Sequence, residues 1–273
     1  GLGDVYKRQK DRVALYMIKN AKKRGDLKDN MPIIEATSGN TGISLAAIGK
    51  AYGHKVYIFM PDWVSEERIK LMEAYGAEVR LYSKEEGGFA KCIEEAKKLA
   101  KIKGGYLTNQ FSNKDNFLAH YETTGKEIIE QLPEEVGGFI SGVGTGGTLT
   151  GTGQYLKEQK PEVKIVALEP DTSPVLSEGK AGPHKIQGIG AGFIPNTLDT
   201  KVYDEVIPVS NEDSFEYSKY IAKEEGVLVG ISSGAALKAA IEVAKRPEFK
   251  GKTVVALLPD SGDRYYSTDL FKD

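Results

Sequence analysis

The sequence predicts an α/β fold with mainly parallel sheets, because short β-rich runs alternate with longer helical patterns almost from end to end. Runs such as "PIIEA" and "KVYIFM" are each followed by a stretch with apolar residues at helical spacing. Glycine accounts for 31 of 273 residues and gathers in a few loops rather than in low-complexity tracts. These observations predict parallel sheets covered on both faces by helices, with glycine loops that bring the backbone close to a ligand.

The expected elements of the first half begin with an amphipathic helix from Lys10 to Lys23, whose apolar face contains Val13, Met17 and Ile18. The β-rich runs that follow are "PIIEA", "KVYIFM", "AEVRLY" and "GYLT". Each is expected to lead into a helix, at about 41–52, 64–75, 88–103 and 114–131 respectively.

In the second half "GGFISG" precedes a helix at about 146–159, "KIVALE" is a further strand, and "DEVIPV" precedes a helix at about 211–225. The run "TVVALLP" is the last expected strand. Residues 170–200 form the one long stretch without clear periodicity, and long loops inside a compact domain are usually functional.

Composition excludes several classes of function. The formal net charge of −2 gives no overall basic field to recruit nucleic acid or an anionic membrane, and the apolar runs are far too short to span a bilayer. A single cysteine, Cys92, excludes an intramolecular disulfide framework and suits a reducing cytosol, so a cytoplasmic protein is expected. Cys92 lies in a helical pattern, where a small buried thiol is the favoured interpretation.

The strongest local signal is "FISGVGTGGTLTG", in which a glycine loop joins a strand to a helix. Glycines let backbone N–H groups approach an anion, and the helix N-terminus adds partial positive charge, so the loop predicts a phosphate site. Gly142, Gly144 and Gly147 also fit G-x-G-x-x-G, and Glu169 ends the next expected strand. A dinucleotide site of an NAD-dependent oxidoreductase is therefore an alternative.

Two further loops carry polar side chains at the start of a helix. In "EATSGNTGISLAA" the side chains of Thr37, Ser38, Asn40 and Thr41 could hold a carboxylate through neutral donors, or simply cap the helix. In "LVGISSGAALKAA" capping by Ser232 is the default interpretation. Loop positions of the same kind are Gln110 and Gly188, and none of these residues is diagnostic alone.

Lys10 stands at the start of a helix, where the dipole disfavours a cation. Such a lysine is most often a solvated surface residue, but burial lowers its pKa and makes it a nucleophile toward carbonyl carbon. The three histidines, His54, His120 and His184, have no metal-ligand spacing, so structural or surface roles and no metal site are expected.

Six segments in order together resemble the cysteine synthase (O-acetylserine sulfhydrylase) family of fold-type-II pyridoxal-phosphate enzymes. They are "KDRVALYMI", "EATSGNTGISLA", "SGVGTGGTLTG", "IQGIGAGFIP", "GISSGAA" and "LPDSGDRYYST". The resemblance implies two three-layer α/β/α domains of the tryptophan-synthase-β type. It also implies that pyridoxal 5′-phosphate is the cofactor.

The same resemblance implies roles for individual residues. Lys10 corresponds to the lysine that carries the cofactor, and Asn40 to the partner of the cofactor's 3′-hydroxyl. Ser232 corresponds to the partner of the pyridine nitrogen. The phosphate cradle corresponds to Gly144, Thr145, Gly146, Gly147 and Thr148. The amino-acid substrate site corresponds to Thr37, Ser38, Thr41, Gln110 and Gly188, with Asn40 in the same loop.

The implied reaction is a β-replacement that makes L-cysteine from O-acetyl-L-serine and sulfide, with Lys10 as the base for the Cα proton. A homodimer and an association with serine acetyltransferase are also implied. A cystathionine β-synthase-type replacement is the nearest alternative, and "LAHYETT" has some of its character. "GIGAGFIP" and "DSGDRYYST" favour cysteine synthase instead.

The start of the chain departs from the family, in which a strand and a serine-valine pair precede the lysine. Residues 1–9 are therefore interpreted as a non-native, adapter-derived leader. A smaller N-terminal domain, incomplete and with cross-over elements, is expected over 10–115, and a larger cofactor-binding domain over 116–273. On this interpretation the chain is expected to be weakly active or inactive, because displacement of a reacting group costs rate.

Overall fold

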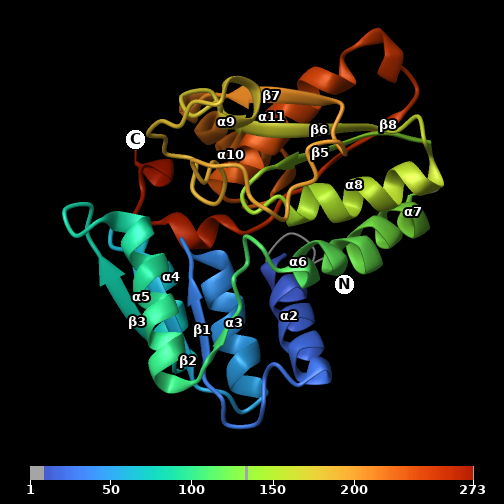
Figure 1. Cartoon of the computed structure of the whole chain (residues 1–273). Helices are drawn as coiled ribbons and strands as arrows, with labels where there is room; N and C mark the ends of the chain where they lie inside the picture. Colours follow the sequence, from blue (N-terminus) through green and yellow to red (C-terminus); the bar gives the residue numbers. More distant parts are fainter. Residues whose placement is uncertain (1–8, 133–134, 273) are drawn as a thin grey trace. The chain divides into compact units, whose positions relative to one another are not determined.

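The computed structural model of the protein describes residues 9–132 and 135–272, and it contains two parallel sheets (Figure 1). The first has the strand order β3-β2-β1-β4 and consists of β1 (Ile33–Ala36), β2 (Val56–Pro61), β3 (Glu78–Tyr82) and β4 (Tyr106–Leu107). The second has the order β7-β6-β5-β8 and consists of β5 (Val136–Gly142), β6 (Lys164–Pro170), β7 (Glu205–Val209) and β8 (Thr253–Ala256). The predicted parallel sheets are confirmed.

The described residues fall into two compact units, 9–115 together with 264–272, and 116–263. The larger domain expected from the sequence ran to residue 273, whereas 264–272 groups with the first unit. The reason is a set of contacts to α4 (Glu66–Ala74): the Tyr265 hydroxyl accepts from Arg68 Nη2 at 2.6 Å, and the Ser267 amide donates to Glu67 at 2.9 Å. Of the interpreted leader, residues 1–8 lie outside the described part.

The first unit has three layers, because the strand side chains alternate between two cores. Ile33, Val56 and Ile58 face one core. Helices α2 (Lys10–Arg24), α3 (Asn40–Ala51) and α4 contribute to that core. The intervening Ile34, Tyr57 and Phe59 face α5 (Gly88–Lys103) on the opposite side. The helix predicted from Lys10 is confirmed, and it ends at Gly25, whose positive φ of 81° suits a glycine.

The second unit repeats this layering. Helix α8 (Gly147–Gln159) buries Leu149 and Leu156 against Phe139 of β5 and Ile165 of β6. The other face of the sheet is covered by α11 (Ile231–Ala244), which contacts all four strands, and α10 (Asn211–Glu225) packs against α11. Within the described ranges no helix combines the length and apolarity needed to cross a bilayer.

The helix expected over 114–131 is interrupted by a π-helical turn. Residues 114–131 are helical throughout, but the π-helical turn η1 (His120–Gly125) separates α6 (Lys114–Ala119) from α7 (Lys126–Gln131). The irregular segment 170–200 contains only the short α9 (Val175–Glu178). The remaining short helices are 3₁₀ turns, η2 (Pro247–Phe249), η3 (Gly262–Tyr265) and η4 (Asp269–Phe271).

Candidate functional site

The loop between β1 and α3 is joined to Gln110 by side-chain hydrogen bonds. The Thr41 hydroxyl donates to Gln110 Oε1 at 2.6 Å, and Gln110 Nε2 donates to the Ala36 carbonyl at 3.3 Å. Thr37 Oγ1 accepts from the Gly39 amide at 3.1 Å, while the side chain of Ser38 is exposed. The structure therefore assembles these predicted residues, from two distant stretches of sequence, into one cluster of neutral hydroxyl and amide groups.

Glu35 is a buried carboxylate beside this cluster that the sequence analysis did not single out. Its buried carboxylate accepts from the amides of Ala36 at 2.8 Å and Gln110 at 3.0 Å, and from the hydroxyl of Thr108. Burial raises the pKa of Glu35 to about 7, and these three donors oppose the shift. The carboxylate thus ties the end of β1 to the backbone that carries Gln110. A charged residue inside the apolar run "PIIEA" was the signal available.

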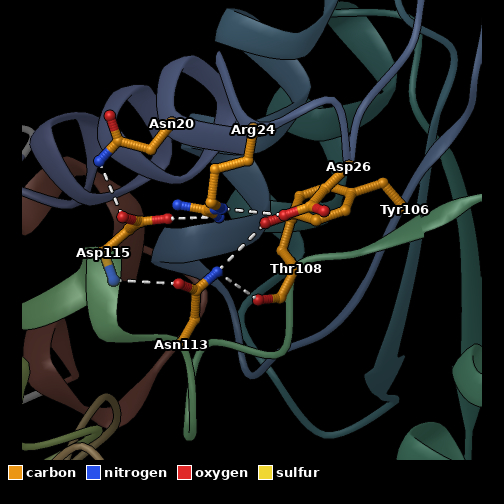
Figure 2. Close-up of polar contacts among 7 residues, drawn as sticks. All are labelled: Asn20, Arg24, Asp26, Tyr106, Thr108, Asn113 and Asp115. Atoms are coloured by element: carbon orange, nitrogen blue, oxygen red, sulfur yellow. Dashed lines mark hydrogen bonds and ion pairs between the residues drawn. The ribbon is translucent and has the colours of Figure 1, made fainter. Parts of the chain in front are cut away.

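The outer side of the Gln110 segment is held by a second polar network (Figure 2). Asn113 Nδ2 donates to the Thr108 carbonyl at 2.9 Å, and Asn113 Oδ1 accepts from the Asp115 amide at 3.0 Å. Asp115 in turn pairs with Arg24 at 2.9 Å from the end of α2. The pairing raises the pKa of the Arg24 guanidinium. The loop that carries Gln110 is therefore fixed from both sides.

Lys10 is the first residue of α2 and is partly buried. Desolvation lowers the pKa of its ammonium group to about 8. An amine with this pKa is unprotonated far more often at neutral pH than an ordinary lysine, so it can attack a carbonyl carbon or accept a proton. Lys10 is therefore not the fully solvated surface lysine that is most often found at such a position.

The glycine loop between β5 and α8 is packed so closely that side chains would not fit at its glycine positions. A Cβ on Gly144 would overlap the carbonyl oxygen of Gly188. Gly146 caps α8 with a φ of 80°, and Asn116 Nδ2 donates to the Thr145 hydroxyl oxygen at 2.9 Å. The result is a fixed turn at the N-terminus of a 13-residue helix, where backbone amides and the dipole favour an anion.

Gly188 and Ser232 lie beside the same loop. Gly188 has a φ of 100°, and a Cβ placed there would be 3.9 Å from Ser232 Oγ. Ser232 is buried in the first turn of α11. The structure therefore brings Gly144, Gly188 and Ser232 together within one unit.

The contacts of Glu169 disfavour the dinucleotide site that the sequence offered as an alternative. Its buried carboxylate accepts from the amides of Leu176 at 2.6 Å and Ser177 at 3.1 Å, and from the Ser177 hydroxyl at 2.6 Å. These donors belong to α9, so the carboxylate serves as a local cap rather than as a ligand for a ribose hydroxyl.

The remaining candidates have structural contacts. His54 Nδ1 lies 2.9 Å from the Met31 carbonyl, and His184 Nε2 lies 3.0 Å from that of Gly190. His120 is buried, with Nε2 at 3.3 Å from the hydroxyl of Thr148. Cys92 is buried as expected, and burial raises its pKa to about 11. Among the described residues no three metal-ligating side chains cluster.

Comparison with known families gives a match over residues 9–260 to the pyridoxal-phosphate dependent enzymes. The chain belongs to this family. The chain is 50% identical to a cysteine synthase of Staphylococcus aureus (strain N315) over 263 residues, which is 96% of this chain and 84% of that protein. The resemblance inferred from the six segments is thereby confirmed.

Solved structures of family members share the fold. The cysteine synthase of Entamoeba histolytica superposes with a TM-score of 0.93 at 44% identity, covering 98% of this chain and 79% of that chain. The O-acetylserine dependent cystathionine β-synthase of Helicobacter pylori gives a TM-score of 0.90 at 39% identity, covering 96% and 85%. The predicted fold class, fold-type-II pyridoxal-phosphate enzyme, is confirmed by these neighbours.

The described residues fit the family cofactor. The glycine loop at the N-terminus of α8 suits a phosphate, because backbone amides and the helix dipole favour an anion at this position. Lys10, with its pKa of about 8, suits an aldehyde carbon. A hydroxyl near the loop, Ser232, suits a ring nitrogen that is not protonated.

Proposed function

We propose that the protein is a pyridoxal-phosphate-dependent enzyme that makes L-cysteine from O-acetyl-L-serine and sulfide. The observation that carries the proposal is Lys10, an amine with a pKa of about 8 at the first position of α2. The 50% identity to a cysteine synthase supports the choice of reaction.

The proposal assigns the cofactor to two sets of groups. Lys10 binds its aldehyde carbon, Asn40 its 3′-oxygen and Ser232 its pyridine nitrogen. The backbone amides of 144–148, with the hydroxyls of Thr145 and Thr148, bind its phosphate. When bound, pyridoxal phosphate supplies an electron sink for the substrate's Cα.

Different side chains bind the substrate carboxylate and move the substrate's Cα proton. Thr37, Ser38, Thr41 and Gln110 hold the substrate carboxylate through neutral donors, while Gly188 lines the amino-acid site with its backbone. Once the substrate's amino group had replaced Lys10 on the aldehyde carbon, the freed Lys10 amine would take the Cα proton while acetate leaves Cβ. Its lowered pKa matches this role, because a general base works best with a pKa near the operating pH.

Ser232 controls which reaction follows. A neutral hydroxyl leaves the pyridine nitrogen largely unprotonated, whereas an aspartate would keep it charged. The weaker electron withdrawal favours loss of acetate from Cβ over transamination. Addition of hydrosulfide at Cβ and return of the proton from Lys10 to Cα would then complete the replacement.

Finer assignments follow from the same proposal. The protein works in the cytoplasm as a homodimer and associates with serine acetyltransferase. Its small-molecule substrates are O-acetylserine and sulfide. The buried Cys92 requires no disulfide, which suits a reducing compartment.

Sulfide-dependent formation of cysteine tests the proposal. Purified protein loaded with pyridoxal phosphate is incubated with O-acetylserine and either sulfide or homocysteine. We expect cysteine from sulfide at a rate at least about ten times that of cystathionine from homocysteine. The 39% identity to the cystathionine β-synthase of H. pylori makes the second product the relevant competitor. A preference for homocysteine would move the assignment to that activity, and no product from either would refute the β-replacement.

A further inference from the structure

Two arginines converge on one atom of Asn40. Arg264 Nη1 donates to Asn40 Oδ1 at 2.8 Å, and Arg68 Nε donates to the same oxygen at 3.4 Å. A guanidinium group has donors only, so the atom that faces both arginines must be the amide oxygen. The two contacts therefore fix the orientation of the Asn40 amide.

Arg68 is itself held rigidly. Its side chain is 1% exposed, and its guanidinium carbon lies 4.5 Å from the centroid of the Tyr265 ring. Nη2 donates to the Tyr265 hydroxyl at 2.6 Å, and Nη1 donates to Ser65 Oγ at 3.3 Å. A guanidinium with this many contacts cannot swing away from Asn40 without leaving buried donors unpaired.

Gly39 makes room for this arrangement. A Cβ at this position would overlap Cδ and Nε of Arg68, and the φ of 151° disfavours any side chain. The glycine before Asn40 thus allows Arg68 to pass directly against the loop backbone.

We propose that Arg264 and Arg68 are positioning residues that turn Asn40 Oδ1 toward themselves, so that Asn40 presents its Nδ2 hydrogens to the cofactor's 3′-oxygen. This inference rests on the proposed function, which assigns Asn40 to that oxygen. A hydrogen-bond donor at this place favours the deprotonated 3′-oxygen over the hydroxyl form. Arg264 directly precedes Tyr265, so the C-terminal segment 264–272 supplies both an arginine that contacts Asn40 and the tyrosine that holds Arg68.

Asn40→Asp tests the acceptor role and the donor role of the amide separately. The carboxylate keeps acceptors for both arginines and adds charge complementarity, but it removes the Nδ2 donor. We expect the cofactor-free variant to melt at or above the wild-type temperature. We expect its dissociation constant for pyridoxal phosphate to rise about 10- to 100-fold, as the loss of one hydrogen bond to a charged group predicts.

Arg264→Met tests the arginine directly, and Arg264→Lys is its conservative partner. The methionine variant frees the amide to rotate, so we expect weaker cofactor binding by about 10-fold and a shift of the bound cofactor's absorption toward the form with a protonated 3′-oxygen. Lysine should restore part of both. Arg80→Met, which removes a guanidinium paired with Glu78 on the edge strand β3, is the matched control and should change neither.

The outcomes separate this inference from the function on which it rests. Wild-type protein that binds no pyridoxal phosphate contradicts the proposed function. The amide orientation is still decided in that case, because a melting temperature of cofactor-free Asn40→Asp more than about 5 °C below wild type would show that Oδ1 does not face the arginines. Unchanged cofactor affinity and absorption in both Asn40→Asp and Arg264→Met would overturn the positioning role.

Discussion

The loops that precede α3 and α8 occupy equivalent positions in the two sheets, but one presents side-chain groups and the other presents backbone groups. Both follow a strand of a parallel sheet and begin a helix, the place where such folds collect ligands. The loop at 37–41 presents side-chain hydroxyls and amides that are organised by Gln110 and Glu35. The loop at 144–147 presents mainly backbone, because neighbouring atoms leave no room for a Cβ at Gly144, Gly146 or Gly147. In a site made of side chains, a substitution removes one donor at a time. In a site made of backbone, a substitution that disturbs the packing displaces several donors together.

Gly144→Ala should have the largest effect, because the added methyl group would overlap the Gly188 carbonyl, a backbone atom that cannot move cheaply. We expect destabilisation by about 2–3 kcal/mol from overpacking. We also expect cofactor affinity to fall about 100-fold, because a displaced turn loses several backbone donors at once, each worth about 1 kcal/mol. Thermal melts and titration with pyridoxal phosphate measure the two effects.

Gly179→Ala is the control for that variant. Gly179 also has a positive φ, 70°, but nothing lies within 4 Å of a Cβ placed there. The substitution should cost about 1 kcal/mol of backbone strain and leave cofactor binding unchanged. Equal loss of cofactor in both alanine variants would remove the packing argument.

Thr41→Val tests the side-chain loop. It removes the hydroxyl that donates to Gln110 Oε1 but keeps the shape of the residue. We expect the KM for O-acetylserine to rise about 10-fold with cofactor affinity unchanged, since one hydrogen bond to a charged carboxylate is affected. Thr41→Ser should stay close to wild type. Parallel losses of substrate and cofactor affinity would contradict the division of labour between the loops.

The pH dependence of stability sharpens the comparison, because Glu35 is a titratable support of the side-chain loop. Its pKa is raised from 4.5 to about 7 in the folded protein, so the folded state binds more protons than the unfolded state between these values. The contribution of Glu35 to stability is therefore largest below pH 4.5 and is lost as the pH rises through 7. The full change amounts to about 3 kcal/mol.

Glu35→Gln should flatten that dependence between pH 5 and pH 7 in chemical denaturation experiments. It should also raise the KM for O-acetylserine, because an amide cannot accept from Ala36, Thr108 and Gln110 in the same way. A wild-type stability profile that rises with pH over this window, with no difference in the glutamine variant, would show that Glu35 does not titrate as described.

Arg24→Ala should have the smallest effect. The Arg24 side chain is 48% exposed and that of its partner Asp115 is 6% exposed, so solvent screens the ion pair on the arginine side. We expect a loss of about 1 kcal/mol that shrinks as salt is added, with cofactor affinity unchanged. Urea denaturation at low and high salt measures this loss. A decrease of more than about 3 kcal/mol in the free energy of unfolding would mean that the ion pair behaves as a buried pair and stabilises the loop more than its exposure suggests.

Much of the fold could be predicted from the sequence, because β-rich runs alternate with helical patterns along the chain and the helices have long apolar faces. The helices expected at 88–103 and 211–225 agree with α5 and α10 at both ends. The π-helical turn at His120–Gly125 could not be predicted, since its widening depends on tertiary packing rather than on a local pattern. The return of 264–272 to the first unit could not be predicted either, because it rests on long-range contacts of Tyr265 and Ser267.

The candidate site shows the same limit. The glycine and hydroxyl loops were visible because their residue types are uncommon at helix starts and occur as motifs. Glu35, Arg68 and Arg264 were missed because a single charged residue is usually solvated, and only burial reveals its partners. The sequence thus indicated the groups that we propose to contact the ligand, while the groups that orient them could be identified only from the structure.

The central claim, that Lys10 carries pyridoxal phosphate, is tested most directly by mass spectrometry of the borohydride-reduced protein. The protein is incubated with the cofactor, reduced and digested, and every lysine-containing peptide is weighed. The account predicts one reduced cofactor group on Lys10, and its loss when O-acetylserine is added before reduction. A cofactor group on another lysine, or an unmodified Lys10 in protein that has bound the cofactor, would contradict it.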